Sequence, residues 1–230
     1  MNPQIFGWEH FTYLAIFIIV TVIGVIFAKK YAKSEKSQNI ILKTIATILL
    51  IAIVTNRISI VFKSGIADWK QLIPDSYCGM SSLVLSLAVL VGKKDNNVLH
   101  FVWFMALLGG VITMIYPDFI GQSDSIFYLP TISGLLHHSI SIALVILLFL
   151  FNQIHVTYKK WYCTVFGFTS YITVGAFLIG VLGYSDAFHI IEPLLEGTPL
   201  TAWGVMPIYI VLYGLTILAF EMARKYSKHL

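Results

Sequence analysis

The chain contains the stretch FTYLAIFIIVTVIGVIFAKK at residues 11–30, an apolar run from Phe11 to Ala28 that ends at Lys29 and Lys30. A helix needs about 20 consecutive, mostly apolar residues to cross the hydrocarbon core of a bilayer. The run meets that length, and the lysines that follow it are typical of a helix end that reaches the headgroups. This stretch therefore predicts a membrane-spanning helix.

Six further apolar runs follow along the chain, at residues 39–62, 76–92, 98–116, 130–151, 161–183 and 204–223. The whole chain of 230 residues is 58% hydrophobic and only 11% charged, whereas a typical globular protein has roughly 25% charged residues. Short connections between the runs leave no room for a soluble domain. We predict an all-α membrane protein, a bundle of about seven transmembrane helices in which residues 1–230 form a single transmembrane domain.

The lysines and arginines predict the orientation of the bundle. The first, third and fifth loops and the C-terminal tail hold eleven of them, and the three opposite loops hold only Lys63 and Lys70. Because loops rich in Lys and Arg stay in the cytoplasm, we expect the N-terminus outside, the C-terminus in the cytoplasm, and a multi-pass protein of a cell membrane. The net charge of +4 is spread over short loops and does not indicate a nucleic-acid partner. Loops this short do not imply a soluble protein partner either. Membrane lipids are the expected partners.

The segment PDSYCG, residues 74–79, carries the most chemical meaning. Asp75 or Ser76 is a good N-cap, so Cys78 falls in the first turn of a helix, where the helix dipole favours a thiolate. Ser82 follows one turn later on the same helix face. His138 lies about two turns inside the fifth run and is predicted to reach toward Cys78, which would form a nucleophile–base pair.

Each of these residues also has a structural interpretation. A free cysteine in a membrane helix is often a small packing residue, and an intramembrane histidine often makes an interhelical hydrogen bond. His137 faces about 100° away from His138, and we interpret it as structural. Arg57, near the end of the second run, either extends to the headgroups or binds a phosphate or carboxylate. The sequence leaves both roles of Arg57 open.

Four short motifs resemble the YwaF family of bacterial membrane proteins, which is related to an animal family of cysteine-dependent phospholipid acyltransferases. Pro74 to Cys78 resembles a Pro-x-His-x-Cys segment, with Ser76 in place of the histidine. Gly109 to Asp118 resembles a glycine-rich helix that ends in Thr-Pro-Asp, with Tyr116 in place of the threonine. The His137-His138 pair resembles a later helix with an inward histidine, and Trp203 to Tyr209 resembles a Trp-Pro-x-Tyr motif.

The resemblance implies a thiol-dependent lipid acyltransferase that acts within the membrane. Cys78 would be the nucleophile and His138 the general base, and the acyl group would pass through a thioester to a lysolipid hydroxyl. Arg57 would bind the lipid phosphate, and the other expected substrate-binding residues are Ser82, Tyr116 and Tyr209. We expect no metal and no cofactor. The alternative is a small-molecule transporter or ligand-binding membrane protein that uses the same polar pocket.

Overall fold

The chain folds into a bundle of α-helices. The computed structural model describes residues 6–63, 69–117 and 126–227, in which there are seven α-helices, two short 3-10 helices and no strand. Asp68, Asp118 and Lys228, which the sequence places in loops and in the tail, lie outside these residues. The elements in chain order are α1 (Trp8–Tyr31), α2 (Glu35–Lys63), η1 (Trp69–Leu72), α3 (Tyr77–Val91), α4 (Asn97–Ile115), α5 (Leu129–Leu150), η3 (Tyr158–Lys160), α6 (Tyr162–Gly180) and α7 (Ala202–Ser227).

Each predicted apolar run coincides with one α-helix, which confirms the all-α membrane fold. Six of the helices are long and apolar enough to cross a membrane, and α3 is a shorter apolar helix. With its 15 residues and a rise of 1.5 Å per residue, α3 extends about 22 Å. It is therefore shorter than the hydrocarbon core of a bilayer, which is about 30 Å thick.

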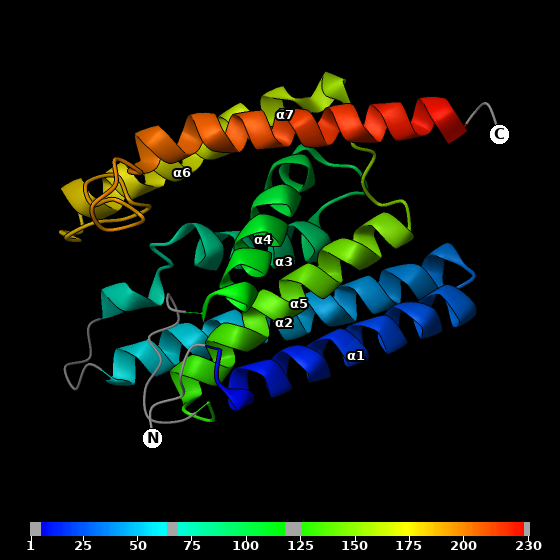
Figure 1. Cartoon of the computed structure of the whole chain (residues 1–230), viewed down its shortest axis with the longest axis horizontal. Coiled ribbons are helices and arrows are strands. Elements are labelled where there is room, and N and C mark those ends of the chain that lie inside the picture. The colour runs from blue at the N-terminus through cyan, green and yellow to red at the C-terminus, as the bar shows by residue number, and fades with distance from the viewer. Residues whose placement is uncertain (1–5, 64–68, 118–125, 228–230) are drawn as a thin grey trace.

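Helix α4 lies at the centre of the arrangement. It packs against α3, α5 and α6, while α5 also packs against α1 and α2, and α7 packs against α6. Figure 1 shows α6 and α7 as a pair on one side and α1, α2 and α5 on the other, with α3 and α4 between them. Along this view α1, α5 and α7 run from left to right, and α2 and α6 run from right to left. This alternation is what successive membrane spans require.

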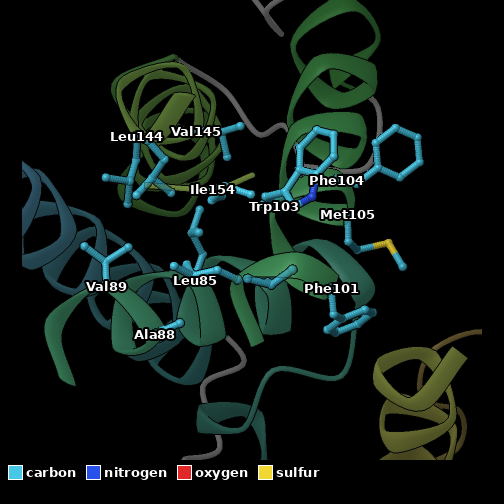
Figure 2. Packing of buried hydrophobic residues seen from close by; sticks show 14 of the residues in the cluster. Leu85, Ala88, Val89, Phe101, Trp103, Phe104, Met105, Leu144, Val145 and Ile154 are labelled. Atoms are coloured by element: carbon cyan, nitrogen blue, oxygen red, sulfur yellow. The ribbon is translucent and has the colours of Figure 1, made fainter. Parts of the chain in front are cut away.

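The apolar core lies where α3, α4 and α5 meet. Leu85 of α3, Trp103 of α4 and Leu144 of α5 are almost completely buried, and Figure 2 shows them within one cluster. By contrast, most of the large apolar side chains of α1 are exposed. A helix that is apolar all round and buried on one side only suits contact with lipid.

The cation-rich loops meet at one end of the bundle. The backbone N–H of His155, between α5 and α6, donates to Asp95, between α3 and α4. The Lys160 ammonium donates to Asn97 at the start of α4, and Arg224 of α7 donates to the Val156 carbonyl. The α1–α2 loop lies at the same end, on the right of Figure 1. We call this the cation-rich end; that it faces the cytoplasm remains a prediction.

Candidate functional site

The site begins at the N-terminus of α3, at the end of that helix remote from the cation-rich end. Ser76 is its N-cap, with extended backbone angles, and its Oγ accepts the Gly79 N–H at 3.2 Å. Of the two caps that the sequence allowed, Ser76 is the one used, which leaves Asp75 free to pair with another group. The cap places Cys78 in the first turn of α3, where it is half-buried and has a free thiol.

The Cys78 thiol packs directly on the backbone of α4. A Cβ built on Gly109 would lie only 2.7 Å from the Cys78 Sγ, so only glycine leaves room for the thiol in this position. One turn further along α4, the Thr113 side chain is within hydrogen-bonding range of the thiol. Tyr171 of α6 is close enough to interact electrostatically with Cys78, and its hydroxyl lies 3.1 Å from the Ser81 hydroxyl.

His137 is held by a closed chain of hydrogen bonds between α3 and α5. Ser141 Oγ donates to the His137 carbonyl at 2.7 Å, so its single proton is used there. Ser82 Oγ, 3.0 Å from Ser141 Oγ, must then donate to Ser141 and accept from His137 Nδ1, also at 3.0 Å. This order assigns the proton of His137 to Nδ1 and leaves Nε2 with its lone pair free.

His138 lies beside His137, with 4.1 Å between the two ring centroids. Its carbonyl oxygen would lie 3.2 Å from a Cβ on Gly110, so α5 approaches α4 at the glycine next to the one that faces Cys78. Within the described residues, neither imidazole forms a hydrogen bond with the Cys78 thiol. The imidazole that bonds to the Cys78 face of α3, through Ser82, is the one on His137, which the sequence analysis interpreted as structural.

Arg57 of α2 lies beside the start of α3. Its Nη1 is 3.4 Å from Asp75 Oδ1 and its Nη2 donates to Asn56 Oδ1 at 3.2 Å, while its Nε is buried without a partner in the described part of the chain. Asn56 in turn donates to the Pro130 carbonyl of α5 at 3.0 Å. Two side chains therefore hold the Arg57 guanidinium beside the start of α3.

The other two predicted substrate-binding residues lie at the end of α4 and on α7. Tyr116 follows the last residue of α4, is 41% exposed, and its ring lies 6.3 Å from that of Phe6. Tyr209 of α7 is buried among aromatic rings of α4 and α6, and its hydroxyl donates to the Phe101 carbonyl at 3.4 Å. The structure therefore brings Cys78, Ser82, Arg57 and the two histidines into one region, and places Tyr209 in the α4–α6–α7 core.

Several residues of this region have no site role in the prediction from the sequence, namely Asn56, Asp75, Thr113, His137 and Tyr171. One local signal was present, because His137 and Ser141 are four residues apart and must share a face of α5. Tyr171 had no such signal, because its approach to α3 is a contact between distant parts of the chain. Among the described residues, no group of three or more His, Cys, Asp or Glu side chains is arranged to hold a metal ion.

A bundle of long apolar helices that encloses a cluster of serine, histidine, arginine and cysteine side chains defines a polytopic membrane protein with a polar site between its helices. The particular family follows from comparison with known families. The TMEM164 family model matches residues 5–223, nearly the whole chain, and the chain belongs to the TMEM164 family of membrane proteins.

No curated protein and no solved structure matches the chain. The family that matches is TMEM164. The YwaF resemblance and the bacterial source therefore stay predictions, while the multi-pass membrane class is established by the family and by the six long apolar helices.

Proposed function

We propose that this chain is a thiol-dependent lipid acyltransferase, a single domain within the cell membrane that acts on membrane lipids with Cys78 as its nucleophile. The observation that carries the proposal is the position of the Cys78 thiol. It lies in the first turn of a capped helix, on a glycine of α4, with Thr113 beside it and an imidazole pair on the next helix. A thiol at a helix N-terminus with an imidazole in the same site is a nucleophile–base arrangement.

The short length of α3 supports the same function. If its last turn lies at the membrane surface, a helix of about 22 Å begins some 8 Å inside the opposite edge of a core about 30 Å thick. Cys78 is then below the headgroups, at the depth of the ester carbonyls and upper acyl chains of a lipid. A nucleophile at this depth reaches its substrate from within the bilayer.

The proposed reaction proceeds in two steps. In the first step, His138 takes the Cys78 proton, the thiolate attacks the ester carbonyl of a donor lipid, and the C–O bond breaks to give a Cys78 thioester. The leaving alkoxide takes the proton from the imidazole. In the second step, a lysolipid hydroxyl gives its proton to the imidazole and attacks the thioester, which releases the new ester and returns the proton to Cys78. Catalytic hydrogen bonds are often longer before substrate binds. In the proposed reaction, the His138 imidazole must therefore come closer to the Cys78 thiol when the substrate is bound.

The neighbouring residues have distinct proposed roles. His137, with Nδ1–H fixed on Ser82, would orient the imidazole pair, and the lone pair of its Nε2 is free to accept a hydrogen bond. Arg57 would bind the lipid phosphate, because its Nε is unpartnered in the described part of the chain and its bond to Asp75 is long at 3.4 Å. A phosphate that replaces Asp75 would accept two parallel N–H bonds from the guanidinium.

The decisive experiment is acyl transfer by the purified full-length protein between a labelled phospholipid and a lysophospholipid. We expect Cys78→Ala to abolish both transfer and the covalent label on the protein, and His138→Gln to reduce transfer by about 10²- to 10⁴-fold, the usual contribution of a general base. Cys163→Ala is the matched control, because Cys163 is also a free cysteine. Full transfer by Cys78→Ala would refute Cys78 as the nucleophile, and no transfer by the wild-type protein would favour the ligand-binding or transport alternative.

A further inference from the structure

A cavity of about 300 Å³ lies at the cation-rich end of the bundle, remote from Cys78. Its walls come from the start of α2, the end of α3, the start of α4 and the end of α5. Helix α3 thus has the thiol site at one end and this cavity at the other. Nothing in the proposed acyl transfer uses these residues.

The walls of the cavity divide into an apolar floor and a cationic rim. The floor consists of aliphatic side chains, namely Leu42, Ala88, Val89, Leu99 and Leu148. The rim holds three cations against one carboxylate, with two amides between them, from Lys43, Lys93, Lys94, Glu35, Asn39 and Gln153. The lining therefore has an excess of two positive charges above an apolar base.

Gly92 allows the rim to form. A Cβ at this position would lie 2.2 Å from the Ala88 carbonyl oxygen and 2.6 Å from the Asn96 side-chain nitrogen, distances that no real side chain adopts. The chain therefore leaves α3 at Gly92 in an extended conformation and brings Lys93 and Lys94 to the edge of the cavity. Both lysines are exposed, with no ion pair to a carboxylate in the described part of the chain.

We propose that this cavity binds the headgroup phosphate of an anionic phospholipid from the adjacent leaflet. Basic pockets between membrane helices are typical sites for anionic lipid headgroups. The volume is at the small end of ligand pockets, which hold about 300 to 1,000 Å³, so it accepts a headgroup and the upper part of one chain. The lysines would contact the phosphate, and the aliphatic floor would contact the glycerol and first methylenes.

The test is thermal unfolding of the purified full-length protein in detergent with added dioleoyl phosphatidylglycerol, dioleoyl phosphatidylcholine or inorganic phosphate. A ligand that binds the native state raises the unfolding temperature. We expect phosphatidylglycerol to stabilise the wild type, and Lys93→Ala/Lys94→Ala to need about 30-fold more of it for the same stabilisation. Lys29→Ala/Lys36→Ala is the matched control, because it removes two exposed lysines from the same end but outside the cavity.

Lys93→Arg/Lys94→Arg keeps the charge, and we expect it to respond like the wild type. Three results would each overturn the proposal. The first is that Lys93→Ala/Lys94→Ala and Lys29→Ala/Lys36→Ala lose the stabilisation by phosphatidylglycerol to the same extent. The second is that phosphatidylcholine stabilises the wild type as much as phosphatidylglycerol does. The third is that inorganic phosphate alone gives the full stabilisation, which would assign the site to a free anion. None of these measurements involves acyl transfer, so their outcome is independent of the proposed function.

Discussion

At the scale of single residues, Gly109 controls the position of the Cys78 thiol. Substituting Gly109→Ala would place a methyl group 2.7 Å from Sγ but 3.8 Å from the Cys78 Cβ, so rotation of the thiol relieves the clash. If acyl transfer depends on the present position, a displacement of about 1 Å lowers the rate by about 100-fold. We expect that loss with an almost unchanged unfolding temperature, measured by lipid transfer and thermal unfolding.

Gly24→Ala in α1 is the control for this substitution, since nothing lies within 4 Å of a Cβ there. Full transfer by Gly109→Ala would show that the thiol position is not important for the reaction. Loss of transfer together with a large drop in unfolding temperature would instead assign the effect to packing of α3 on α4.

At the scale of elements, α4 and α6 approach closely at one glycine. A Cβ on Gly167 would lie 2.0 Å from the Phe101 ring, and that ring is buried and packed edge-on against Tyr171. Because the ring has no space to move, we expect Gly167→Ala to destabilise the protein by about 1–3 kcal/mol, the usual cost of overpacking. Unfolding in denaturant measures the change.

Gly180→Ala lies on the same helix with no neighbour within 4 Å, and we expect it to cause no loss of stability. Equal effects of the two substitutions would mean that α6 does not pack tightly on α4 in the membrane. The comparison separates this contact from the general effect of alanine on a helix.

Asp95 joins the loops that follow α3 and α5. Its Oδ1 accepts the His155 N–H and the His100 Nε2, each at 2.8 Å. Burial alone would raise its pKa, but these hydrogen bonds and the neighbouring histidines hold the pKa of Asp95 below its ordinary value. A lowered carboxyl pKa stabilises the fold above the pKa of the unfolded chain, about 4, and this stabilisation is lost as the pH falls through the folded pKa.

We therefore expect Asp95→Asn to lower the unfolding temperature at pH 7 and to differ progressively less from the wild type as the pH falls below about 4. Asparagine suits the positive φ of 56° at this position because it also adopts left-handed backbone angles. Glu192→Gln, at an exposed loop position, is the control. A stability difference that stays constant from pH 7 to pH 3 would contradict the ionic role of Asp95.

At the scale of the whole molecule, the orientation in the membrane is testable. In a Cys78→Ala/Cys163→Ala background, Glu196→Cys should react with an impermeant thiol reagent in intact cells, and Ser34→Cys should react only after lysis. The reason is the excess of cations at the end that contains Ser34, and both positions are exposed. The reverse labelling pattern would invert the topology.

Much of the fold follows from the sequence, because membrane spans are defined by local composition. The run 130–151 predicts α5 to within one residue at each end, since every backbone group in a bilayer must bond within its own helix. The Ser76 cap and the placement of Cys78 in the first turn are equally local. These features depend on neighbours within about four residues.

The tertiary structure alone determined which side chains meet. Three contacts depend on how the helices rotate and pack against one another. They are the hydrogen bond between His137 and Ser82, the pairing of Arg57 with Asp75, and the hydrogen bond from Tyr209 to the Phe101 carbonyl. Inside a bilayer the hydrophobic effect does not distinguish one apolar face of a helix from another. The rotation of each helix is therefore set by the packing of small residues such as Gly109 and Gly110. The sequence thus predicted the helices and the first turn of α3, while the packing of α3, α4 and α5 decided the composition of the site.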